Sequence, residues 1–141
     1  MSWNSDISKS QLVPSKIRDG SSPKNVHDAM VVGKLVFAST SALLMGDAER
    51  QLEYELVFSH FDIHADILKV SHHGSKTSTL EEFLQAVHPM IAVISVGRKN
   101  RYGHPNQDVL DRLKNFGVNV FRTDTDGDFH FTSDGAQWIR E

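Results

Sequence analysis

An apolar run that stops abruptly at two adjacent histidines constrains this chain more than any other feature. Residues 67–70 are uniformly apolar apart from Lys69, which predicts a buried strand, and Ser71-His-His-Gly-Ser75 follows directly. Reactive groups in open α/β sheets lie where strands end, because the loops there open into a crevice. The histidine pair therefore predicts a functional site at the end of this strand.

Two other predicted strands stop in the same manner. Ser41 to Met45 is followed by Gly46 and Asp47, and Ile91 to Val96 is followed by a polar loop that reaches His104. The run 91–96 is apolar without alternation, as in a strand covered on both faces. Three strand ends that carry Asp, His-His and His predict a metal site along one edge of a sheet.

Composition narrows both the class of protein and the choice of metal ligands. A chain of 141 residues with 39% hydrophobic and 23% charged residues is typical of one globular domain. Its net charge of −3 argues against a general nucleic-acid binder, so any such contact would be local or metal-assisted. The absence of cysteine leaves His, Asp and Glu as ligands.

Residues 1–25 and the rest of the chain differ in pattern. The first segment is rich in Ser, Lys, Asp and Pro, and we expect a flexible leader or linker with an isolated Trp3. The remainder predicts the order ββ-α-β-α-β-α-β-ββ, an α/β pattern. Strands are expected near 30–37, 42–45, 65–71, 91–96, 118–121, 128–132 and 138–139, and helices near 48–57, 80–87 and 105–117.

Local signals define where two of these helices begin. Ser78 and Glu81 are spaced as a capping box for the second helix. Pro105 would occupy the favoured first position of the third helix, and Gly117 would end it.

Each candidate site residue also has a plain structural interpretation. Asp47 could bridge two cations or cap the following helix, where Asp is a preferred residue. His72 and His73 should leave their strand on opposite sides, so one would face the metal and the other would orient a ligand or donate a proton. The pair could instead lie in an exposed loop. His104 is a metal ligand or a helix N-cap.

Polar residues near these positions could hold a phosphate. Ser75, Lys76 and Thr77 follow the histidine pair and could meet an anion. Arg98, Lys99 and Arg101 form a basic cluster that suits phosphate contacts or is merely a solvated loop. A rival metal site could use four alternating residues that would share one face of an extended segment: His60, Asp62, His64 and Asp66.

Together these motifs resemble the metallo-β-lactamase-like domain of the ComEC family of competence proteins. The resemblance covers roughly residues 25 to 135, and its motifs are specific in this order and spacing. They are Leu44-Met-Gly-Asp-Ala-Glu49, Ala65-Asp-Ile-Leu-Lys-Val-Ser-His-His-Gly-Ser-Lys-Thr-Ser78, Ala92-Val-Ile-Ser-Val-Gly97, Arg101-Tyr-Gly-His-Pro105 and Arg122-Thr-Asp-Thr-Asp-Gly127.

The resemblance implies only part of a fold. Such a domain is an αββα sandwich whose first half carries His-x-His-x-Asp-His, a motif that this chain lacks. We therefore expect residues 26–141 to be its C-terminal half, with a mixed sheet and about three helices on one face. The chain itself should be soluble, because no apolar run approaches the roughly 20 residues of a membrane span.

The resemblance also implies a function. A complete domain would hold two divalent ions, zinc or manganese, and hydrolyse DNA phosphodiester bonds during DNA uptake. It implies catalytic roles for His72, His73 and Asp47, metal ligation by Asp47, His73 and His104, and phosphate binding by Ser75, Lys76, Arg98 and Arg101. Whether His72 or His73 coordinates stays open. The isolated chain should bind metal weakly or not at all and show little or no hydrolysis.

Partners and location follow in the same way. The implied partners are single-stranded DNA and the missing N-terminal half, and an exposed sheet face would favour a homodimer. The implied parent is an integral membrane protein with this domain outside the cytoplasm. Two alternatives remain: another hydrolase of the superfamily, such as a ribonuclease or lactonase half, and a non-catalytic module that binds DNA or a partner.

Overall fold

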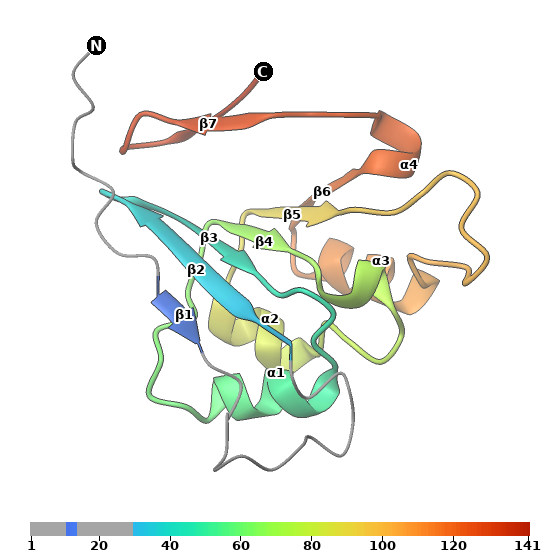
Figure 1. The fold of residues 1–141 in the computed structure, drawn as a ribbon, viewed down its shortest axis with the longest axis horizontal. Helices are drawn as coiled ribbons and strands as arrows, with labels where there is room; N and C mark the ends of the chain where they lie inside the picture. Colours follow the sequence, from blue (N-terminus) through green and yellow to red (C-terminus); the bar gives the residue numbers. More distant parts are fainter. Residues whose placement is uncertain (1–10, 14–29) are drawn as a thin grey trace.

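A computed structural model describes residues 11–13 and 30–141, which form an α/β fold around one mixed sheet (Figure 1). Six strands pair in chain order: β1 (Gln11–Val13), β2 (Val32–Phe37), β3 (Thr40–Leu44), β4 (Ile67–Lys69), β5 (Ile91–Ile94) and β6 (Asn119–Arg122). The first three are antiparallel, whereas β3 to β6 run parallel. Two further strands, β7 (Phe131–Ser133) and β8 (Trp138–Arg140), pair as a hairpin.

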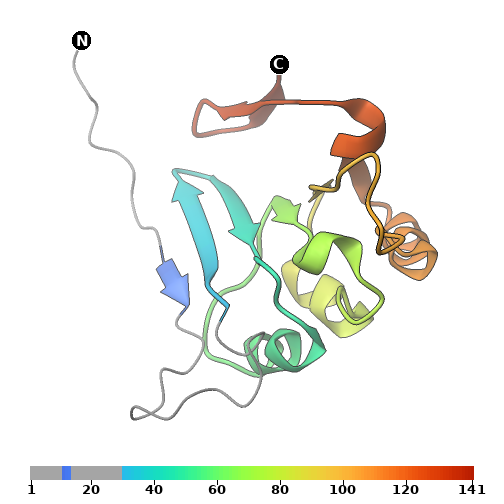
Figure 2. The ribbon, with the colours of Figure 1, turned by 45° about the vertical axis from the view of Figure 1, so that its right-hand side comes forward.

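Three helices cover one face of this sheet (Figure 2). They are α1 (Arg50–Val57), α2 (Glu81–Val87) and α3 (Gln107–Asn115), and shorter turns form η2 (Ser71–Gly74) and α4 (Thr123–Asp126). Leu43, Leu68 and Ala92 are neighbours across the strands and therefore point to the same side. They share one buried core with residues of all three helices, among them Leu52, Leu56, Phe83, Leu84, Val109 and Leu113. The predicted mixed sheet with about three helices on one face is confirmed.

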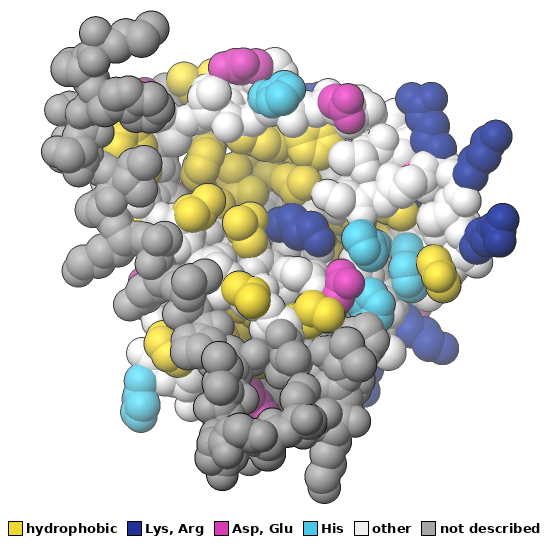
Figure 3. All heavy atoms as spheres, in the orientation of Figure 1, with side chains coloured by type: hydrophobic (Ala, Val, Ile, Leu, Met, Phe, Trp, Pro, Cys, Tyr) yellow, Lys and Arg dark blue, Asp and Glu magenta, His cyan; other side chains and the backbone are white. Residues whose placement is uncertain are grey.

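The part of the chain that the structure describes leaves the opposite face of the sheet partly uncovered. Leu35 and Leu44 lie there with 47% and 40% of their surface exposed, beside the half-buried Lys69. The β7–β8 hairpin covers only one end of this open face, where Phe131 packs edge-on against Phe121 with ring centroids 5.5 Å apart. Figure 3 shows hydrophobic side chains gathered beneath the hairpin. The homodimer expected from such a face stays a prediction.

The capping box predicted for the start of the second helix is wrong. Ser78 does not cap α2, and the helix begins at Glu81 without a side-chain cap. The Ser78 hydroxyl instead donates to the carbonyl oxygens of Ser71 and Ser75, at 3.1 and 2.9 Å. This residue therefore closes the preceding turn, and the helix N-terminus finds its acceptor elsewhere.

The third helix begins two residues later than predicted. Pro105 lies before the helix, and Asn106 is the N-cap, where its side chain accepts from the amide of Asp108 at 3.0 Å. The end of the helix is as predicted, because Gly117 follows Asn115 closely and has a left-handed φ of 71°.

The N-terminal segment is described only in part. Residues Gln11–Val13 form β1, which pairs with β2. Residues 1–10 and 14–29, with Trp3 and the rest of the expected leader, lie outside the described residues. Within the described part of the chain, no helix has the length and apolar character needed to cross a bilayer.

Candidate functional site

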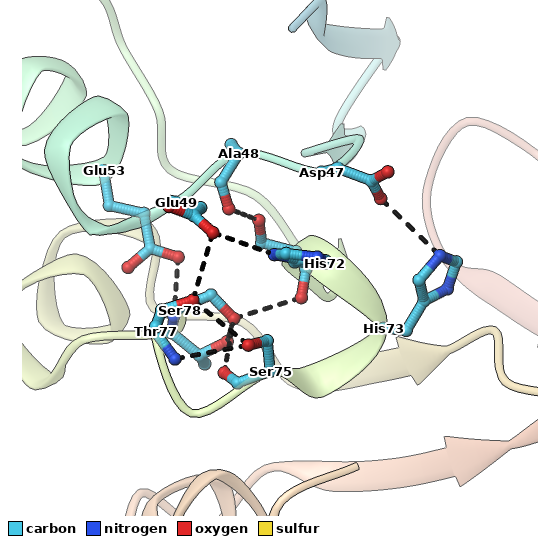
Figure 4. A network of polar contacts seen from close by, with 11 residues as sticks. Asp47, Ala48, Glu49, Glu53, His72, His73, Ser75, Thr77 and Ser78 are labelled. Carbon is cyan, nitrogen blue, oxygen red and sulfur yellow. Dashed lines mark hydrogen bonds and ion pairs between the residues drawn. The ribbon is translucent and has the colours of Figure 1, made fainter. Parts of the chain in front are cut away.

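Three parallel strand ends bring the predicted site residues to one edge of the sheet. Asp47 follows β3, His72 and His73 follow β4, and His104 lies in the loop after β5. Asp47 Oδ1 is 3.6 Å from His73 Nε2 (Figure 4). The rings of His72 and His104 have centroids 5.9 Å apart. The structure thus gathers these four residues from three separate loops.

A left-handed turn gives the two adjacent histidines their positions. His72 and His73 have φ values of 46° and 54°, and Gly74 continues the turn at 80°. The prediction that they leave the strand on opposite sides is wrong, because extended geometry has already ended at Ser71. The turn is anchored by the His72 amide, which donates to the Gly46 carbonyl oxygen at 3.0 Å.

His73 is held by a backbone carbonyl on the neighbouring strand end. Its Nδ1 lies 2.6 Å from the carbonyl oxygen of Ser95. Because a carbonyl oxygen can only accept, Nδ1 must carry the proton. The neutral ring then has an unprotonated Nε2 on the side of Asp47, which is the arrangement of a metal-binding histidine.

His72 has a carboxylate at the same ring position. Its Nδ1 is 3.4 Å from Glu49 Oε1, and the Thr77 hydroxyl donates to that oxygen, also at 3.4 Å (Figure 4). A carboxylate behind the ring orients a histidine for metal binding or proton transfer. Glu49 closes the Gly-Asp-Ala-Glu motif, but the sequence alone did not point to this role.

His104 is fixed through its backbone rather than its ring. Its amide donates to Asn100 Oδ1 at 2.9 Å, and Asn100 Nδ2 donates to its carbonyl oxygen at 2.8 Å. Burial lowers the pKa of His104, and the proximity of His72 and His73 lowers it further. The neutral imidazole that results is the form that binds metals. The N-cap alternative is wrong, because Asn106 caps α3.

Asp47 is likewise not a helix cap. Glu49 occupies the N-cap position of α1, and no side chain among the described residues caps that helix. The Asp47 carboxylate is 39% exposed and points toward His73 instead (Figure 4).

The donor set suits a divalent transition metal. Imidazole and carboxylate together are ligands for ions such as zinc and manganese. Among the described residues, no three such groups already converge closely enough to hold an ion. Weak metal binding by the isolated chain stays a prediction.

A buried glutamate locks the loop that carries the histidine pair. Glu53 on α1 is fully buried and accepts from the amides of Thr79 at 2.6 Å and Leu80 at 2.9 Å. Burial raises its pKa, while the two backbone hydrogen bonds and Arg112 act in the opposite direction. Arg112 in turn donates to the carbonyl oxygens of Ser78 and Thr79. The sequence contains a sign of this buried role, because the charged Glu53 stands next to Leu52 on the apolar face of the helix.

The predicted phosphate-binding residues differ in accessibility. Ser75 is buried, and its hydroxyl lies 3.1 Å from the Thr77 hydroxyl. Lys76, Arg98 and Arg101 are exposed. Phosphate binding by all four stays a prediction.

At the other predicted metal site, residues 60–66, both carboxylates have partners of their own, and metal binding there stays a prediction. Asp62 Oδ2 accepts from Lys34 Nζ at 2.8 Å, which lowers the pKa of Asp62. Asp66 Oδ2 accepts from the Ser41 amide at 2.7 Å.

Comparison with known proteins identifies relatives of this chain. It is 41% identical over 109 residues to ComE operon protein 3 of Bacillus subtilis (strain 168), with 77% of this chain and 14% of that protein covered. It is 35% identical over 111 residues to competence protein ComA of Neisseria gonorrhoeae, with 77% and 16% covered. Recombination protein 2 of Haemophilus influenzae is 42% identical over 87 residues, with 62% and 11% covered.

The chain therefore spans less than a fifth of the length of these curated relatives. No family model matches it. The sequence identity to these relatives extends over most of the chain, so the chain belongs to the ComEC family of competence proteins.

Proposed function

We propose that this chain forms one side of a metal-dependent site that hydrolyses DNA phosphodiester bonds in a protein of DNA uptake. One observation carries the proposal: two adjacent histidines each have an oxygen at Nδ1, from Ser95 and Glu49, at an edge shared with Asp47 and His104. Oxygen partners behind the rings are typical of metal-binding histidines. One relative is named a competence protein, and we infer from this name that the substrate is DNA.

The residues divide the chemistry among them. Asp47, His73 and His104 would hold divalent ions, zinc or manganese, which when bound polarise the phosphate and lower the pKa of water. His72, oriented by Glu49, would hold or move a proton at its other ring nitrogen. The exposed side chains of Lys76, Arg98 and Arg101 would bind the phosphate oxygens.

The remaining ligands would come from polypeptide outside this chain. The relatives are several times longer than the segment that this chain matches. The open face, with Leu35 and Leu44 exposed, is where a second layer of a metallo-β-lactamase-like sandwich would pack. In such a parent, which we propose is a membrane protein with this domain outside the cytoplasm, two ions would be held between the halves.

The test joins this chain to the segment that precedes the matched region in a relative and measures cleavage of a labelled single-stranded oligonucleotide. We expect cleavage that requires added manganese or zinc. Asp47→Ala and His104→Ala should each reduce it at least 100-fold, an order of magnitude taken from single catalytic-group deletions. His60→Ala, which removes an exposed histidine outside the cluster, should leave the rate unchanged.

Cleavage that persists in a chelator, or that survives Asp47→Ala, would contradict the proposal. For the 141-residue chain alone, we expect no tight binding of two zinc ions in calorimetry, because no three described ligands converge. Tight binding of two ions with Asp47-dependent cleavage by the chain alone would refute the proposal that this chain forms only one side of the site.

A further inference from the structure

We propose that Tyr102 is a stacking platform for an unpaired base of single-stranded DNA next to the candidate metal site. This inference rests on the proposed function and deepens it, because it names the residue that would hold an unpaired base beside the site. Aromatic side chains beside basic residues are the usual means by which proteins bind single strands without sequence preference.

The first argument is that Tyr102 is exposed and has basic neighbours. Its side chain is 83% exposed. Arg98, Lys99 and Arg101 are exposed in the same loop, and no acidic residue lies between 97 and 107. In a chain of net charge −3, this is a local concentration of positive charge around one open aromatic ring. The combination matches the two needs of a single strand, a cation for phosphate and a ring for a base.

The second argument is the orientation of the Tyr102 ring. Tyr102 and His104 have rings inclined by only 19°, with centroids 6.0 Å apart. The His104 ring in turn lies 5.9 Å from that of His72. Three rings therefore follow one another from the solvent to the candidate metal ligands. A base stacked on Tyr102 would place its sugar-phosphate chain beside both the basic side chains and the histidines.

The loop that presents Tyr102 is fixed before any ligand binds. Asn100 lies two residues earlier and bonds both the amide and the carbonyl oxygen of His104, at 2.9 and 2.8 Å. Its amide also donates to the Gly97 carbonyl oxygen at 3.1 Å. A preorganised loop loses little conformational entropy on binding, so stacking energy is retained as affinity.

Single-stranded DNA fits this geometry better than a duplex. In a duplex both faces of every internal base are already stacked, whereas an unpaired base can expose a face to an aromatic side chain. Figure 3 shows a group of histidine side chains on one part of the surface, separate from other histidines, with Lys and Arg side chains at the adjoining margin. This arrangement would let a strand pass from the basic margin to the histidines.

The experiment measures binding of a dye-labelled single-stranded oligonucleotide to the 141-residue chain by fluorescence anisotropy. Low salt favours phosphate contacts, and a chelator removes any metal and any hydrolysis. Tyr102→Ala should weaken binding at least fivefold, the loss of one stacked base. Tyr102→Phe keeps the ring and should bind within about twofold of the unmodified chain.

Two controls make the result specific. Phe58→Ala removes an aromatic ring that is 81% exposed but lies outside the basic loop, and it should leave the affinity unchanged. An oligonucleotide of the same length without bases should bind the unmodified chain and Tyr102→Ala equally. A strand containing bromodeoxyuridine should crosslink on irradiation to Tyr102, identified by mass spectrometry.

Several outcomes would overturn the inference. They are no measurable binding by the unmodified chain, equal binding of Tyr102→Ala to the base-containing strand, or the same loss for the strand without bases. Equal dependence on Tyr102 for duplex DNA would also overturn it. Because a chelator is present throughout, the result is independent of metal-dependent cleavage, and either proposal can fail while the other stands.

Discussion

The two loops that carry the histidines are built in contrasting ways. The locked loop, residues 71–80, holds His72 and His73 and is tied down by the buried carboxylate of Glu53. The presenting loop, residues 97–105, holds His104, is braced by its own Asn100 and packs through Pro105 against Gly74. Its side chains from 97 to 103 are exposed apart from that asparagine.

This difference indicates how such a site can separate the positioning of the histidine pair from contact with a substrate. Buried hydrogen bonds from α1 and α3 set the position of the histidine pair, so geometry in the locked loop depends on the core. The presenting loop keeps its charges and its aromatic ring in solvent, where a substrate meets them. Substitutions should therefore affect folding in the first loop and binding in the second.

The largest expected effect is from Glu53→Ala on α1, which removes the carboxylate that ties down the locked loop. Two buried amides, of Thr79 and Leu80, would lose their acceptor, and the free energy of unfolding should fall by about 4 kcal/mol. Urea denaturation followed by circular dichroism measures this. Glu55→Ala on the same helix removes an exposed residue that contacts Gln51, and should change stability by less than about 0.5 kcal/mol. Similar losses in both variants would contradict the locking role.

Gly74→Ala tests the contact between the two loops. A Cβ on Gly74 would lie 2.6 Å from Pro105 Cβ, and the residue has a φ of 80°. We expect a loss of about 3 kcal/mol from overpacking and left-handed strain together. Gly103→Ala is the matched control, because its φ is 69° but nothing lies within 4 Å of the added Cβ. Its loss in thermal or urea unfolding should be about 1 kcal/mol. Equal losses would show that the loops are not in close contact.

Asn100→Ala should act on the presenting loop alone. Loss of its hydrogen bonds to His104 should lower the free energy of unfolding by about 1 kcal/mol. Hydrogen exchange should accelerate at the His104 amide, while the Leu80 amide in the locked loop keeps its protection. Equal acceleration in both loops would mean that they open as one unit.

The smallest effect is a pH dependence that arises from Glu53, the residue that ties down the locked loop. Burial raises the pKa of Glu53, so the folded state binds its proton more tightly than the unfolded state. The free energy of unfolding should therefore fall as the pH rises from 4.5, the ordinary value, through the raised pKa. Asp62 and Asp134 have lowered pKa values and act in the opposite sense at more acidic pH. Glu53→Gln should remove the decline above pH 4.5, and an unchanged slope in that variant would exclude Glu53 as its source.

Most of the sheet and the gathering of the site could be predicted from the sequence, but β1 could not, because Gln11–Val13 lies in the segment expected to be a flexible leader. Apolar runs predict β3, β4 and β5, and parallel strand ends bring Asp47 and three histidines together. Helix starts were not predictable from local patterns, because the acceptor before α2 is Glu53, 26 residues away from Thr79. The pairing of Glu49 with His72 depends on a left-handed turn that replaces strand alternation, and no period in the sequence signals it.

The left-handed turn at His72 and His73 has a consequence for protein engineering. An L side chain costs about 1–2 kcal/mol in this conformation, less for asparagine, aspartate and histidine than for other side chains, whereas glycine has no Cβ to clash. Glycine at either position should therefore relieve this strain and raise the melting temperature. A selection for heat-resistant variants of this chain would enrich the changes that erase its proposed chemistry, so thermal tolerance and activity would have to be screened together.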